Sequence, residues 1–199
     1  MISNNHNIWF SLSEQYLKTS KLIMEQIRTN NNKWFMIEDH PIEWDQYFEA
    51  TKWSDFNTLV PSIFLMQHGL ELLLKGFMKM YGEQIPRNHK NMDQMLGVLR
   101  KQHKFNDGLI DLMSKYSGSS PKNKLFTEFN KLNKRLNSSN FHVNIRYPEE
   151  QNGNEIDFSP FRYKESSLLS ELDRMIQDID IILIETVELV RNYERVKNQ

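Results

Sequence analysis

The chain has 199 residues, of which 39% are hydrophobic and 26% are charged, and its formal net charge at pH 7 is −1. This composition is typical of a single soluble globular domain and excludes disordered, collagen-like and fibrous proteins. The sequence contains no cysteine, which excludes disulfide bonds, thiolate nucleophiles and cysteine-ligated metal sites.

Helical periodicity dominates the chain. Apolar residues recur at spacings of three and four, glycine and proline are few, and β-branched alternation is scarce. This pattern predicts an all-α antiparallel bundle of five to six helices. The first helix is expected over residues 8–28, and the three asparagines at 30–32 end it.

Residues 33–56 form an unusual insert in which large aromatic side chains alternate with carboxylates. The insert contains three of the four tryptophans of the chain. One interpretation is a short helix that covers the core with its aromatic face, because large aromatic side chains mostly contribute buried area. The alternative is an exposed surface that binds a partner protein or a second copy of the chain. The aromatic members are Trp34, Phe35, Trp44, Tyr47, Phe48, Trp53 and Phe56.

The second long helix is expected over residues 57–81. It is apolar on most sides, which indicates a helix at the centre of the bundle. A third helix is expected over residues 88–100 and a short one over residues 107–116. Ser120 followed by Pro121 predicts the start of a fourth long helix, because a hydroxyl cap before a proline is a common helix start. Its inward face is expected to comprise Leu125, Phe126, Phe129, Leu132 and Leu136.

The last third of the chain combines a loop and a long helix. Residues 138–163 are polar and contain proline and glycine, so an irregular loop is expected there. The last helix is expected over residues 164–195. Neither a repeat nor a linker divides the sequence, which predicts one domain over residues 1–199.

Three polar side chains share one face of the second long helix. His68, Glu71 and Lys75 follow a spacing of three and then four residues, which places them on one stripe. Burying such groups is costly unless they pair, and a glutamate four residues before a lysine is in the favourable order. We therefore favour a Glu71–Lys75 ion pair that orients the bundle, with His68 bonded to nearby backbone or a tyrosine. The alternative is that the stripe belongs to a functional site.

Positive charge is concentrated in the middle of the sequence. Residues 84–148 carry 12 basic and 4 acidic side chains, whereas residues 149–199 carry 6 basic and 12 acidic ones. Residues 1–83 carry 7 basic and 10 acidic side chains. The basic middle can neutralise the acidic flanks inside the fold, which is the favoured interpretation, or it can form a positive groove for phosphate groups.

One candidate catalytic pair follows from the fourth helix. Lys124, Lys131 and Arg135 share a stripe there, and a continued helix would bring His142 onto the same line. Arginine beside histidine suits phosphodiester chemistry, because imidazole moves a proton while guanidinium holds the phosphate. The polar residues 138–140 are an alternative helix end that would break this line. The six histidines show no metal-ligand spacing and no glycine-rich phosphate loop is present, so we expect neither a metal nor a cofactor.

Three motifs together resemble a known superfamily. They are the segment Gln67-His68-Gly69-Leu70-Glu71-Leu72-Leu73-Leu74-Lys75-Gly76, the sequence His89-Lys90-Asn91-Met92, and Arg146-Tyr147-Pro148 before a long final helix. This combination resembles the HEPN superfamily over roughly residues 8–195. The resemblance implies a compact helical bundle, frequently a homodimer, that binds nucleotides or RNA. It further implies bacterial defence or toxin–antitoxin function, with an operon-encoded partner protein.

The resemblance also implies site residues. Arg135 and His142 match the outer residues of the motif found in metal-independent endoribonucleases, although Leu136 replaces the usual Asn, Asp or His. The Arg-Tyr-Pro turn is typical of branches in which the catalytic pair is often missing. We therefore expect RNA or nucleotide binding through Lys124, Lys131, Arg146 and Tyr147. Arg146 can instead tie its turn to Glu71 or to a helix end.

Two other functions stay open at this point. One is a ribonuclease that uses Arg135 and His142, and the other is a non-catalytic protein-interaction module that uses residues 33–56. No segment reaches the roughly 20 apolar residues of a membrane span, and the polar residues 1–7 do not resemble a secretory signal. We therefore expect a cytoplasmic protein without membrane association.

Overall fold

A computed structural model describes residues 6–85, 92–101, 105–117, 121–134, 136, 149, 153–164 and 166–197. Within these residues the chain is all-helical, as predicted, and an isolated bridge between Glu149 and Glu155 is the one extended pairing. The same residues form seven α-helices, so the predicted count of five to six is too low.

The helices are α1 (His6–Thr29), α2 (Trp44–Thr51), α3 (Val60–Met80), α4 (Met92–Lys101), α5 (Asp107–Ser117), α6 (Lys124–Leu132) and α8 (Ser166–Lys197). A π-helical turn, Asp55–Leu59, leads directly into α3, and a 3-10 turn, Ser159–Phe161, precedes α8. The predicted bounds of the first, second and last long helices lie within a few residues of these.

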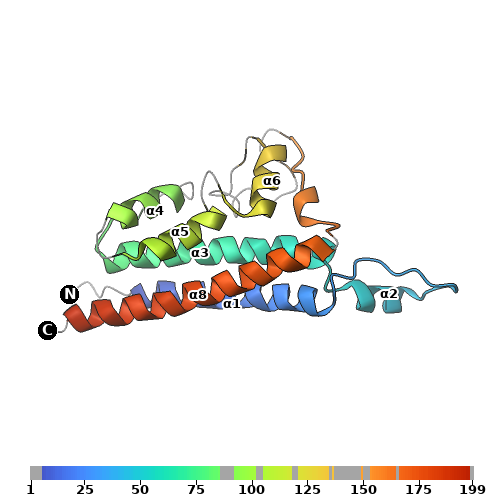
Figure 1. The fold of residues 1–199 in the computed structure, drawn as a ribbon, viewed down its shortest axis with the longest axis horizontal. Helices are drawn as coiled ribbons and strands as arrows, with labels where there is room; N and C mark the ends of the chain where they lie inside the picture. Colours follow the sequence, from blue (N-terminus) through green and yellow to red (C-terminus); the bar gives the residue numbers. More distant parts are fainter. Residues whose placement is uncertain are drawn as a thin grey trace.

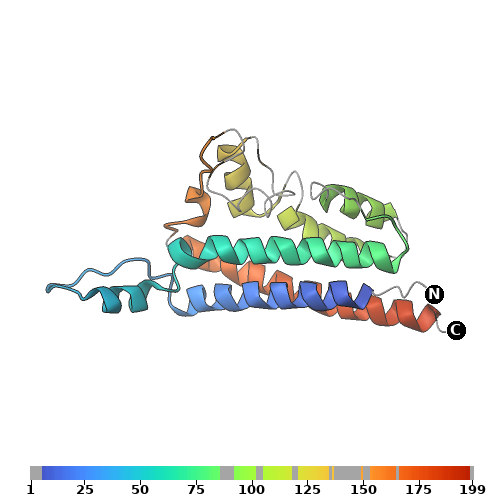
Figure 2. The same cartoon turned by 180° about the vertical axis from the view of Figure 1, so that it is seen from behind.

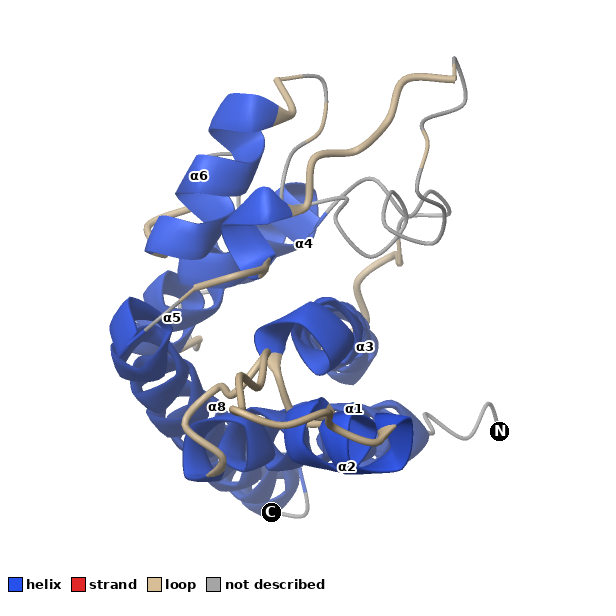
Figure 3. Ribbon diagram, turned by 90° about the vertical axis from the view of Figure 1, so that its right-hand side faces the viewer, coloured by secondary structure: helices blue, strands red, loops and turns tan. Residues whose placement is uncertain are grey.

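Three long helices form the body of the molecule. In Figures 1 and 2, α1, α3 and α8 run side by side, and α1 is antiparallel to the other two. Figure 3 shows α4 and α6 on the side of α3 that faces away from α1, with α5 between α6 and α8. Helix α3 therefore lies at the centre, as its apolar composition predicts. Buried apolar residues of α1, α3, α4, α5, α6 and α8 form one continuous cluster.

Small residues let α1 and α3 approach closely. Ser13 Oγ donates to the Gly69 carbonyl at 2.8 Å, and Ser20 and Ser62 each donate to the other's carbonyl, at 2.8 and 3.0 Å. A Cβ atom on Gly69 would lie only 2.9 Å from Leu17 Cγ. The contact therefore needs glycine at position 69, because a larger side chain would push the two helices apart.

The asparagines after α1 end this helix, as predicted. Asn31 and Asn32 take φ angles of 51° and 50°, in the left-handed region that asparagine tolerates better than most residues. The chain then leaves the bundle.

Residues 33–54, which we call the arm, project from one end of the bundle (Figures 1 and 2). Within α2 the one buried residue is Thr51, while Trp44 is 73% and Phe48 61% exposed. The interpretation of this segment as a cover for the core is therefore wrong. The two rings stack on each other, with centroids 5.9 Å apart, instead of packing against the bundle.

Helix α6 begins later and ends earlier than predicted. The Asn123 side chain accepts hydrogen bonds from the N–H groups of Leu125 and Phe126, at 3.0 and 3.4 Å, and so caps the helix. Pro121 therefore belongs to the preceding loop, and the predicted cap Ser120 lies outside the described residues. The helix ends at Leu132, which was expected to face inward but is 54% exposed.

The loop before α8 is attached to the end of α6. Asn133 Nδ2 donates to the Asp157 carbonyl and Asn133 Oδ1 accepts from the Asp157 N–H, both at 2.9 Å. The described part of the predicted irregular loop, residues 149 and 153–163, contains one 3-10 turn and the isolated bridge between Glu149 and Glu155, and is otherwise without regular structure. None of the helices described here has both the length and the apolar character that crossing a membrane requires.

Candidate functional site

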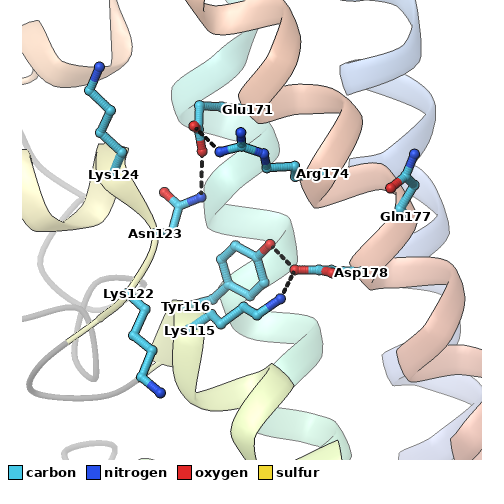
Figure 4. Close-up of a pocket in the computed structure, with 9 residues that line it drawn as sticks. All are labelled: Lys115, Tyr116, Lys122, Asn123, Lys124, Glu171, Arg174, Gln177 and Asp178. Atoms are coloured by element: carbon cyan, nitrogen blue, oxygen red, sulfur yellow. Dashed lines mark hydrogen bonds and ion pairs between the residues drawn. The ribbon is translucent and has the colours of Figure 1, made fainter.

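A cavity of about 260 Å³ opens where the end of α5, the loop before α6 and one face of α8 meet (Figure 4). Cationic side chains outnumber carboxylates around it, four to two. The lining residues are Lys115, Tyr116, Lys122, Asn123, Lys124, Glu171, Arg174, Gln177 and Asp178.

Asp178 on α8 anchors one side of the cavity. Its Oδ2 atom accepts a hydrogen bond from the Tyr116 hydroxyl at 2.5 Å and lies 3.0 Å from Lys115 Nζ. Burial, together with this hydrogen bond, raises the pKa of Tyr116 far above its usual value, so the phenol stays protonated and donates. Two groups of α5 thus compensate the charge of Asp178, and these contacts hold α5 against α8.

Glu171 lies on the same face of α8, seven residues before Asp178. Arg174 Nη1 lies 2.8 Å from Glu171 Oε1, and Asn123 Nδ2 donates to Glu171 Oε2 at 3.3 Å. Asn123 therefore caps α6 with its oxygen and binds α8 with its amide nitrogen. This double role fixes the start of α6 against the cavity.

Lys122 and Lys124 flank Asn123 at the edge of the cavity, and both side chains are exposed. Neither forms an ion pair with any described residue, and the same holds for Lys131 and Lys134 further along. Their charge is therefore available to an external anion.

The favoured interpretation of the basic middle, internal neutralisation, is wrong for these four lysines. Two carboxylates of α8 pair with α1 instead: Lys21 Nζ lies 2.5 Å from Asp180 Oδ1, and Arg28 Nη1 lies 3.0 Å from Asp173 Oδ1. Among the ion pairs of the described chain, Lys115–Asp178 joins a cation of the middle segment to the acidic last helix.

Only part of the predicted site lies within the described residues. Lys124 lines the cavity, and Lys131, seven residues later, lies two turns along the same face of α6. The residues outside are Arg135, His142, Arg146 and Tyr147. Because α6 ends at Leu132, the helical spacing that linked Lys131 to Arg135 and His142 does not extend to either residue.

The polar stripe of α3 lies apart from the cavity. Lys75 Nζ is 2.7 Å from Glu71 Oε1, which confirms the predicted ion pair, and Glu71 is only 1% exposed. His68 Nδ1 lies 3.4 Å from the other oxygen of Glu71, and its ring packs edge-on against Tyr16. These contacts support a structural role for the stripe.

Sequence reasoning missed most of the cavity wall. Tyr116, Glu171 and Asp178 come from two helices whose packing no local pattern reveals. The sequence offers Asn123 as a second possible helix cap beside Ser120, because asparagine directly before an amphipathic segment is a preferred cap.

The surplus of cationic side chains around the cavity suits binding of an anion. In the part of the chain that the structure covers, no three His, Asp or Glu side chains gather as metal ligands would. The fold and the cavity thus define an all-α protein with a cation-rich site. Comparison of the chain with protein-family models, curated proteins and solved structures gives no match.

Proposed function

We propose that the protein is an RNA- or nucleotide-binding helical module of the HEPN type, whose cavity and α6 lysines bind phosphate groups. The observation that carries this proposal is a row of lysines beside the cavity and along α6 that have no carboxylate partner among the described residues: Lys122, Lys124, Lys131 and Lys134. Lysines that neutralise phosphates release condensed counterions, which provides most of the sequence-independent affinity for nucleic acid.

The dimensions of the site favour RNA over a free nucleotide. A volume of about 260 Å³ is below the roughly 300–1,000 Å³ of typical ligand pockets, so a phosphate or a ribose phosphate fits best. Lys124 and Lys131 are about 10 Å apart along the α6 axis, from a rise of about 1.5 Å per residue. The lysine row can therefore contact more than one phosphate of an extended strand.

The proposal extends to the biological setting that the sequence motifs suggest. In this setting the chain is a single cytoplasmic domain of a bacterial defence or toxin–antitoxin system. It forms a homodimer and acts together with a partner protein encoded in the same operon. The proposed setting and partners are based on the motifs of residues 67–76 and 146–148, whereas the proposed phosphate binding is based on the cavity.

The experiment is RNA binding measured by fluorescence anisotropy over a range of salt concentrations. A labelled 12-nucleotide single strand and labelled ATP are titrated with wild type and with Lys122→Ala/Lys124→Ala. The double variant should bind RNA at least about 10-fold more weakly at 50 mM salt, with a salt slope smaller by about 1–2. ATP should bind more weakly than RNA.

A matched control removes two lysines at the other end of the bundle. Lys79→Ala/Lys197→Ala changes the net charge equally but alters the last turns of α3 and α8. It should leave RNA affinity within about twofold of wild type. Absence of RNA binding by wild type, or an equal loss in the control, would overturn the proposal.

Cleavage is the catalytic version of this function and depends on Arg135 and His142. Wild type and His142→Ala are incubated with labelled RNA in EDTA and resolved on a denaturing gel. Cleavage by the wild type alone would establish a metal-independent ribonuclease. Binding without cleavage by either protein would leave a non-catalytic module.

Protein interaction is a second candidate function, and one observation favours it. The arm exposes Trp44 and Phe48 to solvent at the end of the bundle, away from the lysine row. Nucleic acid and a protein partner would thus contact different parts of the molecule.

A further inference from the structure

The arm combines exposed aromatic rings with negative charge. Trp44 and Phe48 stack on its outer part, and Phe35 and Ile37 are exposed in the segment before α2. Residues 33–54 carry five carboxylates and two lysines, and all five carboxylates are exposed. One of these lysines, Lys52, pairs within the arm with Glu49.

These properties restrict what the arm can bind. Large contiguous apolar patches are uncommon on monomeric proteins and typically mark interaction sites. The carboxylates repel nucleic acid and anionic lipid surfaces, because like charges disfavour contact. The complementary surface must therefore be cationic and must offer an apolar contact for the rings.

The same chain carries such a surface on and beside α6. Lys122, Lys124, Lys131 and Lys134 are exposed and form no ion pair with a described residue. Leu132 is exposed among them, directly after Lys131. These four lysines and Leu132, which we call the lysine face, are therefore complementary to the arm. Their charge is opposite to that of the arm carboxylates, and Leu132 offers an apolar contact for the aromatic rings.

The arm does not contact the lysine face of its own chain. In Figures 1 and 2 it extends away from the bundle, beyond the ends of α1 and α3. A second copy is therefore the partner for which this molecule supplies the complementary surface.

We propose that the arm of one copy docks on the lysine face of a second copy. Trp44 and Phe48 pack against Leu132 and the lysine alkyl chains, and the arm carboxylates face the ammonium groups. Each copy has one arm and one lysine face, so reciprocal docking closes a two-fold dimer. The docking does not require RNA binding, but RNA and the second copy would compete for the same lysines.

The test is self-association without RNA, measured by sedimentation equilibrium at 50 and 500 mM NaCl. Wild type should be a dimer at low salt, and its association constant should fall at least about 10-fold at high salt. Trp44→Ala/Phe48→Ala should weaken the dimer by a similar factor. The control Ile184→Ala/Val187→Ala removes exposed apolar side chains of α8 and should have no effect.

Reversing the charges of the arm or of the lysine face gives the sharpest test of the docking proposal. The arm-reversed protein is Glu38→Lys/Asp39→Lys/Glu43→Lys, and the face-reversed protein is Lys122→Glu/Lys124→Glu/Lys131→Glu. Each should be monomeric alone, because both of its reciprocal contacts become repulsive. A mixture of the two should form a heterodimer, because there both contacts are attractive again.

Three results would overturn the docking proposal. They are a wild type that stays monomeric at 50 mM NaCl and about 100 μM protein, a dimer that neither reversal affects, and a dimer that only the α8 control breaks. RNA binding by Trp44→Ala/Phe48→Ala, which leaves the charges of the arm and of the lysine face unchanged, separates the two proposals. If it binds RNA while wild type shows no self-association, the docking proposal and the homodimer of the proposed function fail, whereas phosphate binding by the lysines stands.

Discussion

The bundle and the arm are both rich in large apolar side chains, yet they bury them to opposite extents. Phe77 of α3 is fully buried between Phe10 and Phe105, with ring centroids 5.1 and 4.7 Å away. Trp44 of α2 is 73% exposed. In helix α3, 14 of the 21 residues are buried, whereas in α2 one of the 8 residues is buried. Aromatic content alone therefore does not define a core, because burial requires an opposing surface.

The two regions meet at a small polar network. Asn32 Oδ1 accepts from the Asp55 N–H at 2.7 Å, and Asp55 Oδ2 accepts from the Lys164 N–H at 2.6 Å. Asn32 Nδ2 also donates to Asp55 Oδ2 at 3.1 Å and to the Lys164 carbonyl. Both ends of the arm are thus held to the loop before α8, although the arm itself is not covered.

The largest expected effect contrasts one aromatic residue from each region. Phe77→Ala should lower the free energy of unfolding by about 3–5 kcal/mol, because it leaves a cavity in a packed core. Trp44→Ala should change it by less than about 0.5 kcal/mol, as at other exposed sites. Urea denaturation followed by circular dichroism measures both. A comparable loss for Trp44→Ala would mean that the arm is part of the cooperative core.

The buried ion pair of α3 gives the next largest effect. Glu71→Gln should cost about 3 kcal/mol, because it leaves the charge of Lys75 without its partner in a largely buried position. The double variant Glu71→Leu/Lys75→Met should recover most of this loss, since it removes both charges. The same unfolding experiment compares them. Equal losses in the single and double variants would show that Glu71 stabilises the bundle through contacts other than Lys75.

Much of the bundle was predictable because its helices are long and periodic. The first helix was expected over residues 8–28 and spans His6–Thr29, and the last was expected over residues 164–195 and spans Ser166–Lys197. The Glu71–Lys75 pair was predictable for the same reason, since its geometry depends on one helix alone.

The start of α6 and the position of the arm depend on contacts distant in sequence. The cap at Asn123 is supported by Glu171, 48 residues away, so the choice between Ser120 and Asn123 could not be made locally. Lys124 was identified from a charge stripe on its own helix. Its neighbours in the cavity, Tyr116 and Asp178, are brought together only by the packing of α5 on α8.

The junction of the two regions can be tested at paired asparagines. Asn32→Ala should cost about 1–3 kcal/mol more than Asn31→Ala, because only Asn32 satisfies buried polar groups. Both positions have positive φ, so the backbone strain of the substitution cancels in this comparison. Trypsin should also cleave the arm of Asn32→Ala faster, at Lys33 or Lys52. Identical stability and cleavage in the two variants would show that the network does not hold the arm.

The smallest expected effect concerns the loop that connects α6 to α8. Hydrogen bonds from the Ser159 side chain and backbone N–H lower the pKa of Asp157 below its usual value of 3.8. The charged carboxylate therefore stabilises the folded state above about pH 4, and this contribution is lost as the pH falls through the lowered pKa. Asp157→Asn keeps an acceptor oxygen but removes the charge, so it should cost about 0.2–0.5 kcal/mol at pH 7, since solvent screens this exposed group. Thermal unfolding of both proteins between pH 7 and pH 2.5 should show the difference vanish at the acid end. A stability difference that is constant over this range would mean that the shape of the side chain at position 157, rather than its charge, supports the loop. The loop would then be stabilised by uncharged contacts, as the core is, and not by charge.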